Sequence, residues 1–194
     1  AMSMMQTAEG AFDEMTNIAY RMKELATQGA SDANGDTEWA AQSAEFVALS
    51  AELTSIMENT SFGGTDLLDT ADKFGAGNVV FQVGSSAAET LTVNISTDLA
   101  NVKTAMTSSS TRAATGTSTT NGTFSNVADA QAQLGFVDTL IGEIGTARSS
   151  LGASMNRLEH TMTNVTNMKE NTQAASSTLM DADFAAETSN MTKQ

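Results

Sequence analysis

The stretch VADAQAQLGFVDTLIGEIGTARSSLGASMNRLEHTMTNV (127–165) carries apolar side chains at alternating steps of three and four residues. This spacing places them along one face of an α-helix. Only Arg148 interrupts this seam of apolar positions. The pattern predicts a helix over about 126–174, roughly 70 Å long at 1.5 Å per residue. The seam consists of Val127, Ala130, Leu134, Val137, Ile141, Ile144, Leu151, Met155, Leu158, Met162 and Val165.

A helix of this length must pack against other helices, and the first third of the chain supplies two candidates. Residues 4–29 repeat the same stepping at Met4, Ala8, Ala11, Met15, Ile18, Met22 and Leu25. A second helix, starting at Asp36 or Thr37, repeats it at Trp39, Phe46, Leu49, Leu53 and Ile56. The turn-forming stretch SDANGD (31–36) separates them, so we expect two antiparallel neighbours. The fold class predicted is mainly α, an elongated antiparallel helical bundle with a small β-hairpin region.

The middle of the chain changes period. NVVFQVGSS (78–86) and ETLTVNIS (89–96) are short β-branched runs that predict two strands of a hairpin. A short helix is expected from Asp98 to about Met106. In residues 107–125, 12 of 19 side chains are Ser or Thr, and Phe124 is the only core-forming residue. We therefore divide the chain into two helical halves, 1–72 and 126–194, and a variable region, 73–125.

Composition excludes several classes of site. The chain has 194 residues with 23 acidic and 9 basic side chains, a net charge of −14, which disfavours nucleic acid and anionic membranes as partners. It has no cysteine, so disulfides and thiolate metal sites are impossible. It also has no proline, so no ring interrupts a long helix.

Three stretches resemble those of a known family. QTAEGAFDEMTNIAYRMKELATQGA (6–30) resembles the amino-terminal block of bacterial flagellins, and TSFGGTDLL (60–68) resembles the motif after their second helix. The segment 151–194, from LGASMNRLEH to NMTKQ, resembles their carboxy-terminal block. The matches cover about half of the chain, in the family's order.

The resemblance implies a rod-like structural subunit of the extracellular bacterial flagellar filament, exported by the flagellar apparatus and polymerising for motility. It implies no enzyme activity and no cofactor. The seam is already running at Met4, so the chain is expected to be a fragment without the terminal polymerising segments, and 73–125 a reduced hypervariable region. Implied partners are other flagellin subunits, the vertebrate flagellin-sensing Toll-like receptor, an export chaperone and a cap protein. The alternative is a hook–filament junction protein or a flagellin-like surface protein that binds a ligand such as a polysaccharide.

Three site residues are also implied by the resemblance: Arg21, Leu25 and Glu52 match positions on the surface that the receptor recognises and that packs between protofilaments. Tyr20 stands where the family often has Gln, and Lys23 where it often has Arg. A lysine lacks the planar fork of arginine, which weakens any bidentate contact there. The alternative is that the three are ordinary exposed helix residues.

Other candidates are expected to be structural. His160, the only histidine, lies off the seam, so we expect its side chain to be solvated. Asp181 and Asp183 could bind a metal, but we favour a cap that starts a new helix. DANGD (32–36) predicts a turn rather than a calcium loop. The stretch 107–125 is an O-glycosylation region or, as we favour, a flexible linker.

Overall fold

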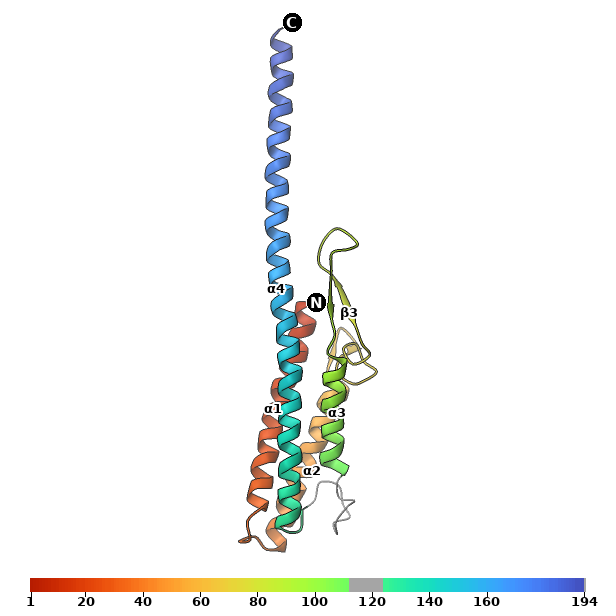
Figure 1. The fold of residues 1–194 in the computed structure, drawn as a ribbon, viewed down its shortest axis with the longest axis vertical. Coiled ribbons are helices and arrows are strands. Elements are labelled where there is room, and N and C mark those ends of the chain that lie inside the picture. Colours follow the sequence, from red (N-terminus) through yellow and green to blue (C-terminus); the bar gives the residue numbers. More distant parts are fainter. Residues whose placement is uncertain (112–123, 194) are drawn as a thin grey trace. The chain divides into compact units, whose positions relative to one another are not determined.

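The computed structural model describes residues 1–111 and 124–193, which are mostly helical (Figure 1). The helices are α1 (Met2–Gly29), α2 (Asp36–Asn59), α3 (Ser96–Thr111) and α4 (Val127–Thr192). The strands are β1 (Ser61–Phe62), β2 (Thr65–Asp66), β3 (Val79–Gln82) and β4 (Thr90–Val93). Strands β3 and β4 pair as the predicted hairpin. The mainly α class with a small β region is confirmed.

The chain divides into two compact units. The larger unit comprises Ala1–Phe81 and Thr92–Met155, and the smaller unit comprises Gln82–Leu91 and Asn156–Gln194. The three-part division made from the sequence stays a prediction.

Helices α1, α2 and the first part of α4 form an antiparallel bundle in the larger unit. Residue numbers rise along α1 as they fall along α4, because Lys23 lies 2.7 Å from Asp138 whereas Glu9 lies 2.9 Å from Arg148. The same argument applies to α2, where Trp39 Nε1 donates to the Gly29 carbonyl at 2.8 Å and Glu45 pairs with Arg21. The core between the three helices includes Phe12, Met15, Met22, Leu53, Val137, Leu140, Ile144 and Leu151.

Arg148 does not break the packing of the seam. Ala147, its neighbour, is fully buried and fills the seam position between Ile144 and Leu151. The guanidinium of Arg148 therefore reaches past the seam, where Nε and Nη2 donate to Glu9 Oε1 at 3.0 and 2.9 Å. Asp13 adds a longer contact at 3.4 Å. Arg148 thus lies beside the seam rather than in it, and its charge is paired with acids on α1.

Phe124 closes the bundle beside the turn between α1 and α2. Its ring is buried and packs edge-on against Phe46, with ring centroids 5.7 Å apart. The buried Ser43 hydroxyl donates to the Phe124 carbonyl at 2.9 Å and accepts from the Phe124 amide at 2.8 Å. Both backbone groups of this residue are therefore satisfied without secondary structure.

The turn predicted at 32–36 is confirmed. The Asn34 side-chain amide donates to the Gln28 and Ser31 carbonyls, at 2.6 and 2.9 Å. The Gly35 amide donates to the Glu38 carboxylate at 2.9 Å, which caps the start of α2.

The predicted end of the long helix is wrong. Helix α4 continues to Thr192, and Asp181 and Asp183 are exposed residues inside it rather than the cap of a new helix. No glycine follows Gly152 and the chain has no proline, so no strong helix breaker occurs in this stretch. An aspartate in a helix interior costs at most about 0.7 kcal/mol relative to alanine, which is too little to end the helix.

The two boundaries of α3 and one short hairpin also differ from the expectations. Helix α3 begins at Ser96 and extends to Thr111, so it includes the start of the predicted Ser/Thr-rich loop. The rest of that loop, 112–123, lies outside the described residues. Its role as a glycosylation region or a flexible linker therefore stays a prediction. A tight hairpin that the sequence reading missed pairs Ser61 with Asp66 and Phe62 with Thr65. Its turn residues Gly63 and Gly64 have φ of 60° and 81°, a conformation that favours glycine at both positions.

Candidate interaction surface

Arg21 joins α1 to α2 on an exposed surface. Its Nη1 lies 3.0 Å from Glu24, one turn along α1, and its Nη2 lies 2.8 Å from Glu45 on α2. Arg21 donates hydrogen bonds to Glu24 and Glu45, and these bonds raise the pKa of Arg21 above its usual value. The structure therefore presents one guanidinium between two carboxylates.

Leu25 and Glu52 occupy different environments. Glu52 is exposed on α2, seven residues after Glu45 and therefore on the same face of that helix. Leu25 is only 2% exposed and packs in the core beneath the surface. Of the three residues implied by the resemblance, two are therefore exposed and one is buried; their role in an interaction surface stays a prediction.

The sequence reading missed both acids that hold Arg21. Glu24 could have been found, because residues three apart on a helix are neighbours. Glu45 could not, because it comes from another helix. Lys23 is also paired, with Asp138 of α4, and the hydrogen bond that Lys23 donates to this carboxylate raises the pKa of Lys23.

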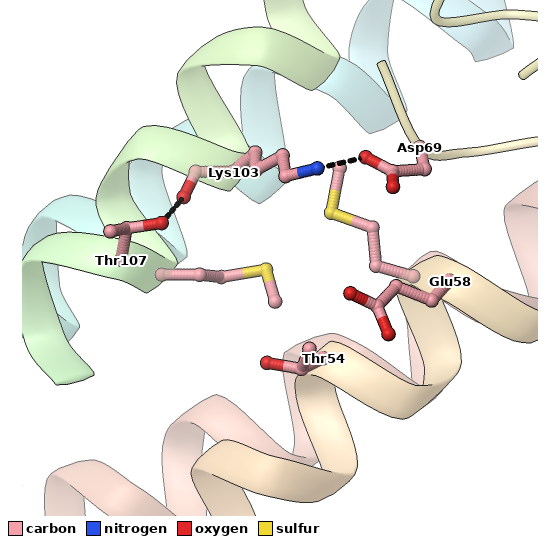
Figure 2. Close-up of a pocket in the computed structure, with 7 residues that line it drawn as sticks. Thr54, Glu58, Asp69, Lys103 and Thr107 are labelled. Atoms are coloured by element: carbon pink, nitrogen blue, oxygen red, sulfur yellow. Dashed lines mark hydrogen bonds and ion pairs between the residues drawn. The ribbon is translucent and has the colours of Figure 1, made fainter. Parts of the chain in front are cut away.

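A hollow of about 230 Å³ lies between α2 and α3. Figure 2 shows the Lys103 ammonium directed at the Asp69 carboxylate, with Thr54 and Glu58 of α2 across the hollow. Thr107 donates to the Lys103 carbonyl at 2.9 Å. The hydrogen bond from Lys103 holds the pKa of Asp69 below its usual range, with help from the Thr70 amide. The lining contains neither histidine nor cysteine, and two of its three charged groups, Lys103 and Asp69, pair with each other.

Replacing Lys103 with Met is expected to remove part of this stabilisation in a pH-dependent way. A carboxyl group with a lowered pKa in the folded state stabilises the fold above its unfolded pKa of about 3.9 and loses that effect as the pH falls through the folded value. The pair is partly exposed, so the loss at pH 7 should be below about 1 kcal/mol. Urea unfolding from pH 7 to pH 2 measures it. Lys73→Met is the control, and a Lys103→Met deficit that persists unchanged at pH 2 would contradict the assignment.

His160 is exposed on α4, as predicted. Residues 1–111 and 124–193 hold no group of three or more His, Cys, Asp or Glu side chains placed to share a metal ion. None of the helices described here combines the length and apolarity needed to cross a membrane.

The smaller unit exposes large apolar side chains on α4. Their exposed fractions range from 52% to 76%, although Leu158 on the same helix is only 3% exposed. Monomeric surfaces carry single apolar residues routinely, whereas a contiguous exposed apolar patch is typical of an interaction surface. The residues are Met162, Met168, Leu179, Met180, Phe184 and Met191.

Comparison with known families gives two matches. Residues 1–73 match the bacterial flagellin N-terminal helical region, and residues 134–194 match the bacterial flagellin C-terminal helical region. Together these cover more than half of the chain, at both of its ends.

Individual relatives agree. Flagellin from Halalkalibacterium halodurans is 36% identical over 98% of this chain and 64% of its own length. Flagellin from Bacillus subtilis is 36% identical over 98% of this chain and 68% of its own length. The chain thus spans about two thirds of these relatives. The crystal structure of Bacillus cereus flagellin aligns with a TM-score of 0.67 at 29% identity, covering 90% of each chain.

The family matches at the two ends of the chain agree with the antiparallel bundle and with these relatives. The chain belongs to the bacterial flagellin family, whose members are structural components of the extracellular flagellar filament rather than enzymes.

Proposed function

We propose that this chain is a structural subunit of a flagellar filament and assembles with copies of itself through exposed helical surfaces. The observation that carries the proposal is the exposed apolar series on α4. The reported relatives are flagellins and give no support to a junction protein or a polysaccharide-binding protein. Family membership also makes an export chaperone and a cap protein expected partners.

Four residues of the exposed series, Met162, Met180, Phe184 and Met191, share one face of α4. Met180 lies 18 residues after Met162, or five full turns, and Phe184 and Met191 point within about 40° of the same direction. Leu151 and Leu158, which are buried, point within about 40° of the direction of Met162. Full burial of each such side chain is worth about 1.5–3 kcal/mol, so another subunit that covers the exposed part gains substantial free energy.

The geometry of the contact also favours a filament. A surface that pairs with a different surface on the next copy, without closing into a ring, generates an open helical assembly. The work of the protein is therefore mechanical, through many repeated contacts.

Phe184→Asp is expected to reduce filament formation at least about tenfold, because it places an unpaired charge in the buried contact and tenfold requires only about 1.4 kcal/mol. Ala174→Asp is the matched control, since Ala174 is exposed on α4 but lies about 120° away from Met162 around the helix. Filament yield is measured by sedimentation and electron microscopy, with swimming in soft agar as the cellular readout. Normal filaments from the Phe184→Asp protein would overturn the proposal.

We also propose that Arg21 and Glu52 contribute to a surface recognised by the vertebrate flagellin-sensing Toll-like receptor and by neighbouring protofilaments, with Leu25 supporting it from the core. The support is the exposure of the two charged residues on adjacent helices and their match to the family positions. Arginine is common among residues whose truncation costs an interface most.

The double variant Arg21→Ala, Glu52→Ala tests this surface. It is expected to activate receptor-bearing cells at least about tenfold less potently than the parent, since loss of 1.4 kcal/mol already gives that factor. Asp32→Ala, an exposed carboxylate in the turn between α1 and α2, serves as the control. Circular dichroism checks that all variants remain folded. Equal potency of parent and double variant would rule the surface out.

A further inference from the structure

We propose that Met162, Met180 and Met191 form an oxidant-sensitive site on α4, where conversion of the thioethers to sulfoxides weakens assembly. The effect on assembly rests on the proposed filament function. The oxidation itself rests only on the structure.

Nine of the 12 methionines fall into two groups of clearly different exposure. Four of them, all on α4 in the smaller unit, are 52–73% exposed: Met162, Met168, Met180 and Met191. Five are at most 7% exposed in the larger unit: Met5, Met15, Met22, Met57 and Met106. The other three, Met2, Met4 and Met155, are intermediate. An oxidant in solution therefore reaches one group directly and reaches the other only when the bundle opens.

Three of the exposed methionines share one face of α4. At about 100° per residue, Met180 returns to the direction of Met162 and Met191 lies about 20° from it. Met168 lies about 240° from Met162 and so points elsewhere. Phe184 lies among the three, so they are part of the apolar surface proposed to contact another subunit. Met168 provides an internal control with similar exposure and chemistry.

The chemistry is a two-electron oxygen transfer from a peroxide. The thioether sulfur attacks one oxygen of hydrogen peroxide, the O–O bond breaks as the S–O bond forms, and the other oxygen leaves as water after proton transfer. The sulfur is oxidised and the peroxide is reduced. Because the chain has no cysteine, no thiol competes for the oxidant. Methionine is therefore the side chain that peroxide oxidises in a readily reversible way.

The product changes the surface in a defined way. A sulfoxide replaces a flexible apolar side chain with a polar one that carries a strong hydrogen-bond acceptor. Burying that acceptor against an apolar partner without a donor is unfavourable. Three such groups on one face oppose assembly together, whereas one at Met168 lies outside the contact.

The site itself is tested by treating the folded chain with hydrogen peroxide and measuring methionine sulfoxide by peptide mass spectrometry over time. Met162, Met168, Met180 and Met191 are expected to oxidise at least about tenfold faster than Met5, Met15, Met22 and Met57. In urea the rates should converge, because unfolding exposes every thioether. Equal rates for buried and exposed methionines in the folded chain would overturn the site.

The consequence is tested by seeded growth with subunits released from the bacterium's own filaments. Peroxide-treated subunits are expected to elongate seeds at least about tenfold more slowly, and methionine sulfoxide reductases A and B together should restore growth. The triple variant Met162→Leu, Met180→Leu, Met191→Leu should grow normally and resist peroxide, because leucine is a near-isosteric replacement without sulfur. Met168→Leu alone should stay sensitive.

The outcomes separate the two proposals. If untreated and oxidised parent subunits elongate seeds equally well, the effect of oxidation on assembly is overturned. The filament function then still stands. A triple variant that stays as sensitive as the parent would show that the three methionines are not the site. Untreated subunits that never elongate would instead overturn the filament function, and the effect on assembly with it, whereas the peptide map would still decide the site.

Discussion

Replacing Phe124 with Ala is expected to lower the free energy of unfolding of the larger unit by about 3–5 kcal/mol, the range for buried phenylalanines. The ring is buried between the end of α1, the start of α4 and Phe46 on α2. Its removal leaves a cavity that these helices cannot close, because Gly29 and Ala130 facing it are already among the smallest residues. The Ser43 bonds are to the backbone of residue 124, so the variant isolates the ring.

The measurement is urea unfolding followed by the fluorescence of Trp39, the only tryptophan, which is bonded to the Gly29 carbonyl close to the ring. Phe62→Ala is the control, because Phe62 is the same residue type on an exposed hairpin and should change stability by less than about 0.5 kcal/mol. A double-mutant cycle with Phe46→Ala should give a coupling free energy of about 0.5–1.5 kcal/mol between the two edge-on rings. Similar losses for Phe124→Ala and Phe62→Ala would show that the ring does not close the bundle.

Gly75→Ala is expected to destabilise the larger unit by about 2–3 kcal/mol, at the upper part of the range for overpacking. A Cβ atom at this position would lie 1.9 Å from the Asp69 carbonyl oxygen and 2.8 Å from the Thr70 Cα. Both atoms belong to the backbone, so no side chain can rotate away. The loop after β2 would have to move, and with it the Asp69 carboxylate that meets Lys103.

Gly145→Ala is the matched control for this variant and is expected to change stability in the opposite direction. No atom lies within 4 Å of a Cβ at Gly145, an exposed position inside α4. Alanine is favoured over glycine in a helix interior by about 0.5–1 kcal/mol. Thermal unfolding followed by circular dichroism compares the two. A Gly75→Ala protein as stable as the parent would contradict the close approach.

The sequence predicts the bundle well because the apolar spacing that defines each helix also defines its buried face. Phe124 stands out in the same way, as a lone large apolar residue among Ser and Thr. The preference of aspartate for N-cap positions did not predict that α4 continues through Asp181 and Asp183. That preference matters only where a glycine, a proline or the loss of packing already ends the preceding helix. Leu25 shows the limit of resemblance, because a matched position carries no information about burial. Glu45 beside Arg21 required the fold.

The ion pairs of the bundle bear on how its helices are aligned along their length. A seam of Ala, Met, Leu and Ile tolerates sliding, since a shift of seven residues, about 10 Å, again brings apolar groups together. Such a slip would separate Arg148 from Glu9 and Lys23 from Asp138 at once. The Lys23 and Asp138 side chains are about half exposed and those of Arg148 and Glu9 about one third exposed, so each lost pair costs roughly 1 kcal/mol or less. The two ion pairs thus contribute little to stability, yet both can form in only one axial register of α1 against α4.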